Sequence, residues 1–179
     1  IFGVFCLQVG AGAENAFGGV AQAYSEAVAI LVVPAGYPWR VANYFPNFNS
    51  TLNMQHITKW AEPVTMGKAV PEIMRRAFFQ LRNGRPGPVM IEVPLDVMGE
   101  DVPDDWVHVP SFKAKSAPDP SDVKEAAALL AGADRPVIYA GQGIHYAKAW
   151  KELKDLAEQW NIPVTTSCLL YTSPSPRDR

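Results

Sequence analysis

The sequence predicts an α/β fold built on parallel sheets, and three stretches of the chain carry this prediction. They are a helix–turn–strand unit at residues 70–94, a strand–turn–helix unit at residues 1–25, and a strand–helix–strand unit at residues 136–167. Strands that alternate with helices favour parallel pairing, because a parallel connection needs a long crossover. With 179 residues, 48% of them apolar, the chain can bury a core and form one large or two small domains.

The helix–turn–strand unit is the most regular of the three. Its helix places apolar residues on one face, and Pro71 suits the first turn, where a missing N–H costs little. The residues of that face are Val70, Ile73, Met74, Ala77, Phe78 and Leu81. Two glycines and two prolines in Gly84–Pro88 predict a rigid turn, and the apolar run Val89–Pro94 then predicts a buried strand.

The first 64 residues predict two further strands and a long loop. The glycine turn Gly10–Gly12 separates a strand at residues 1–9 from a helix at about 13–25. A strand over Ala29–Val33 is expected to end at Pro34-Ala35-Gly36. Residues 37–56 predict an irregular loop with room for a short helical turn, and residues 58–64 predict a return to the sheet.

The second half begins with a change of composition. Asp, Pro, Ser and Lys accumulate over residues 95–120, which is typical of a surface linker. Ser121 is then the expected N-cap of a helix that extends to Leu130. Strands at 136–140 and 164–167 flank a helix whose Trp150 and Trp160 we expect in the core.

These observations predict four segments. They are a first α/β domain over residues 1–99 that lacks its start, a linker over 100–120, the beginning of a second α/β domain over 121–169, and a non-native tail over 170–179. The chain starts without Met inside an apolar run, and the tail has two Ser-Pro pairs and no periodicity. We therefore expect a fragment of a longer protein.

Composition and charge exclude several classes of function. The net charge of −2 gives no basis for binding nucleic acid or an anionic membrane surface. No apolar run is long enough to span a bilayer, and no secretory signal is visible. Neither Cys6 nor Cys168 has metal-ligand spacing, so both are expected to be buried thiols, which fits a cytoplasmic protein.

The glycine turn at residues 10–12 is the first candidate site. Such a turn lets a ligand approach the backbone at the start of a helix. A dinucleotide fingerprint would need a third glycine where Asn15 stands, and no acidic residue closes the second strand. Glu14 is expected to be a solvated charge at the helix start, while Asn15 either caps or solvates the helix or contacts a ligand.

An ordered set of motifs resembles the thiamine diphosphate-dependent enzymes of the acetolactate synthase type. The resemblance is gapless over residues 9–99 and resumes from Arg135 to about Thr166. The matching stretches are Gly10–Asn15, Gly19–Ala23, Ile30–Val33, Ile57–Lys59, Gly84–Pro94 and Arg135–Gly143. Within the pattern, Ala11, Pro46 and Leu95 depart from residues that are frequent in that family.

The resemblance implies a pyrimidine-binding domain, in three layers around a parallel sheet, followed by the start of a Rossmann-like central domain. It implies thiamine diphosphate and Mg²⁺ as cofactors, a 2-keto acid substrate, and decarboxylation or carboligation as the reaction. The catalytic glutamate would precede Ile1 and the diphosphate motif would follow Arg179. The resemblance thus implies no catalytic residue or metal ligand in this chain, an inactive isolated fragment, and a parent homodimer or homotetramer.

Six residues carry over as cofactor contacts. Gly12 and Asn15 match the turn beside the pyrimidine. Arg85 and the loop Gly141, Gln142, Gly143 match positions that touch a structural FAD, which makes FAD a further candidate cofactor. Alternatively, Arg85 is a turn arginine that bonds nearby carbonyls, and the two glycines only permit a tight turn.

Other residues leave alternatives open. His56 is either a substrate contact or a surface residue, and His108 is expected on the surface or in packing. The aromatic residues of the 37–56 loop either wall a pocket or pack on a neighbouring subunit; they are Tyr37, Trp39, Tyr44, Phe45 and Phe48. At the level of function, the alternatives are a flavin- or nucleotide-binding α/β module and a non-catalytic interaction domain.

Overall fold

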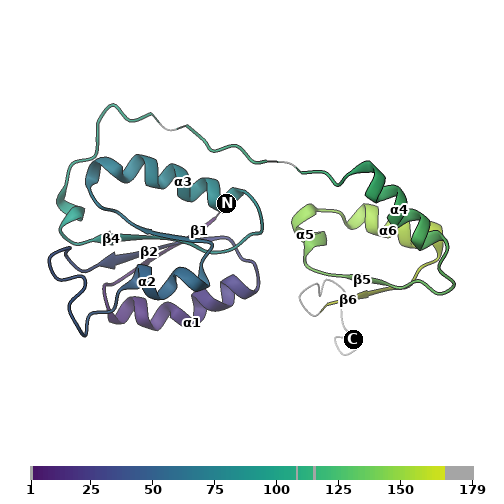
Figure 1. Ribbon diagram of the computed structural model, residues 1–179, viewed down its shortest axis with the longest axis horizontal. Helices are drawn as coiled ribbons and strands as arrows, with labels where there is room; N and C mark the ends of the chain where they lie inside the picture. Colours follow the sequence, from purple (N-terminus) through teal and green to yellow (C-terminus); the bar gives the residue numbers. More distant parts are fainter. Residues whose placement is uncertain (1, 108, 115, 168–179) are drawn as a thin grey trace, which may run out of the picture. The chain divides into compact units, whose positions relative to one another are not determined.

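The computed structural model describes residues 2–107, 109–114 and 116–167, and the chain divides into two compact units, Ile1–Lys115 and Ser116–Arg179 (Figure 1). His108, Cys168 and the expected tail at 170–179 lie outside the described residues.

The first unit is built on a four-stranded parallel sheet with strand order β1-β2-β4-β3, which confirms the predicted α/β fold. Its elements are β1 (Gly3–Leu7), α1 (Ala11–Ser25), β2 (Ile30–Gly36), α2 (Ser50–Met54), η1 (Gln55–Ile57), β3 (Trp60–Pro63), η2 (Gly67–Ala69), α3 (Val70–Arg82), β4 (Val89–Pro94) and η3 (Val97–Gly99). The predicted loop at residues 37–56 therefore contains one short helix near its end.

Helices cover both faces of this sheet, with α3 on one side and α1 and α2 on the other (Figure 1). The face toward α3 buries Leu31 and Ile91 against Ala77, as the helical periodicity predicts. The opposite face buries Val32 and Met90, neighbours of Leu31 and Ile91 along their strands. Because successive strand residues point to opposite faces, β2 is apolar throughout and β4 is apolar except at Glu92, which is typical of a sheet buried on both sides.

Strand β2 runs from Ile30 to Gly36 and so includes Pro34–Gly36, the residues at which the sequence predicts its end. Its ladder with β4 pairs Leu31 with Val89 and then resumes with Ala35 opposite Val93, in the same register. Residues 33 and 34 form no pairs with β4, where Pro34 has no N–H to donate, although both pair with β1. The backbone stays extended at residues 33 and 34, so the strand continues past the missing pairs.

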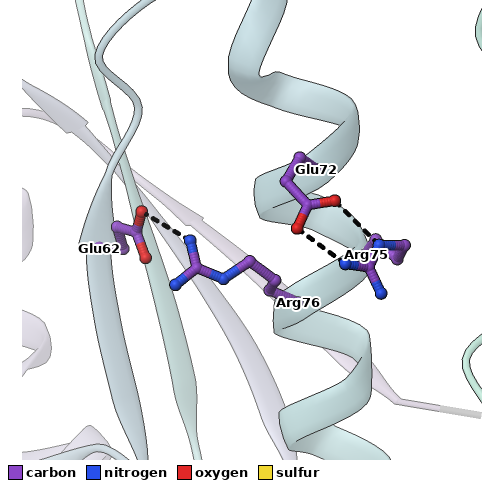
Figure 2. A network of polar contacts seen from close by, with 4 residues as sticks. All are labelled: Glu62, Glu72, Arg75 and Arg76. Carbon is purple, nitrogen blue, oxygen red and sulfur yellow. Dashed lines mark hydrogen bonds and ion pairs between the residues drawn. The ribbon is translucent and has the colours of Figure 1, made fainter.

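Polar contacts connect α3 to Lys59 and to β3 of the first unit. The ammonium of Lys59 donates to the backbone oxygens of Gln80 and of Asn83, the latter at 2.6 Å, near the carboxyl end of α3. Partial burial lowers the pKa of Lys59 below its ordinary value. Figure 2 shows Arg76 of α3 reaching Glu62 of β3, with an N–O distance of 3.2 Å. As an exposed ion pair, it contributes little to stability.

The second unit contains α4 (Pro120–Ala131), β5 (Ile138–Ala140), α5 (Gly143–Ala147), α6 (Trp150–Trp160) and β6 (Val164–Thr166). β5 and β6 pair in parallel, which confirms the predicted strand–helix–strand unit. The N-cap of α4 is Asp119 and not Ser121, because Pro120 occupies the first helical turn. The Asp119 carboxylate accepts a hydrogen bond from the Ser121 N–H at 2.8 Å.

Three burial predictions are wrong for the same physical reason. Cys6 is exposed because it lies on β1, which has a strand neighbour on only one side in the described part of the chain. Trp150 and Trp160 are 47% and 39% exposed, because within their unit α6 packs only against a two-stranded sheet and its neighbouring helices. Apolar character predicts burial only where the fold supplies a second layer.

Candidate functional site

The carboxyl ends of β1, β2 and β4 meet at one edge of the parallel sheet of the first unit. The glycine turn leaves this edge after β1, and the 37–56 loop leaves it after β2. In open parallel α/β sheets, ligands bind in the crevice outside the carboxyl ends of the strands. This edge is therefore the place to look for a site.

Gly10 forms the entry to α1 at this edge. Its φ of 65° lies in the left-handed region, and it occupies the N-cap position without any side-chain cap. A Cβ at this position would lie only 2.6 Å from the hydroxyl of Tyr37. Both the backbone conformation and the close approach of Tyr37 therefore require glycine.

Gly12 and Asn15 lie three residues apart near the start of α1, as the sequence predicts. A Cβ on Gly12 would approach the Cβ of Gln8 to 2.8 Å, so Gly12 lets the helix begin directly above the strand end. The Asn15 side chain is exposed and makes no hydrogen bond within the described residues. It does not cap the helix, and its amide is free for water or a ligand.

Glu92 is a buried carboxylate at the same edge that sequence reasoning missed. It is 8% exposed, and its Oε2 accepts from the Thr51 N–H at 2.9 Å and from the Thr51 hydroxyl. Gly36 lies directly beside it, since a Cβ there would come within 2.7 Å of Glu92 Oε1. The signal in the sequence is an acidic residue inside an otherwise apolar strand.

Glu92 fixes the loop that borders the edge. Thr51 lies in the first turn of α2, where the helix dipole favours a negative charge. At the start of the loop, the Trp39 N–H donates to Asp96 Oδ2 at 2.9 Å. Tyr37, Trp39, Thr51 and Glu92 line a cavity of about 40 Å³, room for water rather than for a cofactor ring. The chain thus presents one wall of a site at this edge.

The aromatic residues of the loop divide into two groups. Tyr37 and Trp39 line the small cavity, and Phe48 packs against the core. Tyr44 and Phe45 are 64% and 98% exposed. Part of the loop therefore borders the site, whereas its tip presents apolar side chains outward.

His56 lies just after α2, in η1. Its ring is exposed, and Nε2 lies 3.3 Å from Nε2 of Gln55. Within the described residues, His56 makes no hydrogen bond with Gly12, Asn15 or Glu92. A substrate contact by His56 stays a prediction.

Arg85 lies at the opposite edge of the sheet, because it precedes β4 whereas Gly12 and Asn15 follow β1. Its guanidinium donates to the Ser25 carbonyl at 3.1 Å, at the carboxyl end of α1, and lies 5.9 Å from the centre of the Tyr24 ring. Arg85 thus makes the carbonyl contact expected of a turn arginine. The structure does not bring it together with Gly12 or Asn15.

The loop Gly141, Gln142, Gly143 follows β5 in the second unit. The Gln142 carbonyl accepts from the His145 N–H at 3.0 Å, and Gly143 opens the five-residue helix α5. A Cβ at Gly141 or Gly143 would meet no atom within 4 Å, and neither residue has a positive φ. Packing within the described residues therefore does not demand these glycines, and their backbone is open to approach.

Nowhere in ranges 2–107, 109–114 and 116–167 do three or more His, Cys, Asp or Glu side chains gather in a way that could hold a metal ion. Across these same ranges, every helix is too short or too polar to cross a membrane.

Comparisons with known proteins agree with this geometry. Residues 123–170 match the family model described as the thiamine pyrophosphate enzyme, central domain. The acetolactate synthase large subunit of Buchnera aphidicola from Acyrthosiphon pisum is 31% identical over 99% of this chain and 32% of its own length. Isozyme 3 of Escherichia coli is 28% identical over 93% of this chain and 30% of its own.

Solved structures share the fold. An X-ray structure from Mycobacterium smegmatis, provisionally described as a thiamin diphosphate-dependent enzyme, matches 93% of this chain and 32% of its own with a TM-score of 0.81 at 25% identity. Benzoylformate decarboxylase from Polynucleobacter necessarius matches 92% of this chain and 31% of its own with a TM-score of 0.79 at 24% identity, a likeness of fold.

The fold and these matches define a class: the chain is a segment of a thiamine diphosphate-dependent enzyme. Within that class it is acetolactate synthase-like. The chain spans about a third of the length of the curated relatives it matches.

Proposed function

We propose that the full-length protein is a thiamine diphosphate-dependent enzyme that decarboxylates a 2-keto acid or joins it to a second carbonyl compound. One observation carries the proposal: similarity to acetolactate synthase large subunits extends over 99% of the chain at 31% identity. The parallel sheet with a glycine turn at its carboxyl edge supports it. A flavin- or nucleotide-binding module without thiamine chemistry is not favoured by these relatives.

Residues of the first unit fit the aminopyrimidine part of this cofactor. The first turn of α1 has no side-chain cap, so its backbone N–H groups are available to an acceptor. The exposed amide of Asn15, three residues after Gly12 on α1, offers both a donor and an acceptor. When bound, the cofactor supplies the carbon nucleophile for the keto acid, while Gly12 and Asn15 bind and orient its ring.

Other parts of the site are proposed to come from outside the described residues. From the resemblance to acetolactate synthases, we propose that Mg²⁺ and the diphosphate are held by residues outside this chain, on a partner subunit of a homodimer or homotetramer. The expected compartment is the cytoplasm. FAD remains a candidate for Arg85 and Gly141–Gly143; an FAD absorption spectrum of the purified full-length protein would support it.

The test compares the full-length protein with this 179-residue chain. We expect CO₂ release from pyruvate or a longer 2-keto acid by the full-length protein, dependent on thiamine diphosphate and Mg²⁺, and none from the isolated chain. Asn15→Ala in the full-length protein should raise the thiamine diphosphate concentration needed for half-maximal activity by about tenfold, as for one lost hydrogen bond in a site. Gln22→Ala, at an exposed position on the same helix, should leave it unchanged.

Two results would contradict the proposal. One is a full-length protein that does not bind thiamine diphosphate in calorimetry. The other is turnover by the isolated chain.

A further inference from the structure

A segment after η3 runs alongside α3 and is attached to the first unit at both ends (Figure 1). We call residues 100–107 and 109–114 the strap. At its start, Glu100 Oε2 accepts from the Gly67 N–H at 2.6 Å. At its end, the Ser111 carbonyl accepts from Arg82 at 2.6 Å, and the Ala114 N–H donates to Asn83 Oδ1 at 2.6 Å. Hydrogen bonds thus attach the strap to the first unit at both of its ends.

A cavity of about 510 Å³ lies between α3 and the strap. Its walls are almost entirely apolar, with Met74 and Phe78 from α3 and Trp106, Val107 and Val109 from the strap. Val107 and Val109 are 76% and 63% exposed, so the strap does not pack down onto the helix. Cavities of this volume and lining are typical of small-molecule sites.

Positive charge is unbalanced at one end of the cavity. Arg75 is neutralised by Glu72, which accepts two hydrogen bonds from its guanidinium at 2.7 and 2.9 Å (Figure 2). Arg82 donates only to the neutral Ser111 carbonyl, and no carboxylate pairs with it in the described part of the chain. The buried hydroxyl of Ser111 has no hydrogen-bond partner there either. This end therefore suits the anionic head of a ligand.

The cavity is also long. Its helical wall runs from Val70 to Arg82, a distance of about 18 Å at 1.5 Å per residue. A linear apolar chain fills such a space better than a compact ring does. We propose that this cavity binds a free medium-chain alkyl carboxylate, with its chain along α3 and its carboxylate on Arg82. The proposal is independent of the thiamine diphosphate site.

The test titrates the 179-residue chain with decanoate, below its micelle concentration, and with the uncharged decanol as the matched probe. We expect saturable one-site calorimetric binding of decanoate that is at least about tenfold tighter than that of decanol. Arg82→Gln should remove this preference without changing decanol binding. Arg75→Gln, whose charge is already balanced by Glu72, should retain the preference.

A second pair of variants guards against loss of folding in Arg82→Gln. Val107→Asp puts a charge into the exposed wall of the cavity and should abolish binding of both probes. Val123→Asp makes the same change at a 49% exposed position of α4 and should leave both unchanged. The proposal is overturned if decanoate shows no saturable binding, if it binds no tighter than decanol, or if Val107→Asp binds it as well as the wild type.

Discussion

The two units of this chain differ in how many of their apolar residues they bury. In the first unit, four parallel strands lie between helices on both faces, and two core clusters form around β2 and β4. In the second, only Ala140 and Ile162 are buried among the apolar residues described, and none of its three helices contains a buried residue. The difference shows that a parallel strand–helix–strand motif needs further strands before its apolar residues find a second layer.

The largest expected effect tests this contrast with matched Leu→Ala changes. Leu31→Ala, at a 2% exposed core position of β2, should lower the free energy of unfolding by about 2–5 kcal/mol through lost burial and a cavity. Leu129→Ala, at a 71% exposed position of α4, should change it by no more than about 0.5 kcal/mol. Urea denaturation followed by circular dichroism measures both. Equal losses would show that the second unit is more buried than its structure indicates.

A second prediction concerns the buried carboxylate at the carboxyl edge. Glu92→Ala leaves the Thr51 N–H and hydroxyl without their acceptor, which should cost about 1–3 kcal/mol of stability in the same denaturation experiment. Glu92→Gln keeps an acceptor oxygen and should cost less. Glu125→Ala, at an exposed position of α4, serves as the control and should be nearly neutral. If Glu92→Ala left the free energy of unfolding unchanged, Glu92 would not be what fixes the 37–56 loop.

A third prediction compares the two sheets directly. Backbone amides of β4, a central strand, should exchange with deuterium roughly tenfold or more slowly than those of β5 and β6. Mass spectrometry of peptides that cover residues 89–94 and 138–140 measures the ratio. Equal protection would mean that the smaller sheet is as stable as the larger one.

The smallest effect concerns the cap of α4. Hydrogen bonds from the Ser121 hydroxyl and N–H hold the pKa of Asp119 below its ordinary value of 3.8. Since the folded-state pKa is the lower one, this contribution to stability is complete above pH 3.8 and is lost as the pH falls through the folded-state pKa. An NMR titration should find the lowered pKa, and Ser121→Ala should return it toward 3.8. An unchanged pKa in Ser121→Ala would contradict this cause.

The sequence predicts those features that depend on local patterning. The apolar face of α3 and the buried strand β4 follow from spacing alone, and both are confirmed. Cys6 and Trp150 are mispredicted because their exposure depends on which layers surround them. Glu92 was missed because its partners Gly36 and Thr51 are distant in sequence and only the folded sheet brings them together. The assignments of Gly12, Asn15, Arg85 and Gly141–Gly143 to cofactors stay predictions.

The contacts of Arg85 have a consequence for any anionic partner at that edge of the sheet. Its guanidinium is already engaged by the Ser25 carbonyl and lies near the Tyr24 ring. An anionic partner would have to displace the Ser25 carbonyl from Arg85, and the last turn of α1 would then lose this hydrogen bond. Binding of an anion at Arg85 would therefore act on the same helix whose opposite end carries Gly12 and Asn15. The two edges of the sheet would be linked through α1.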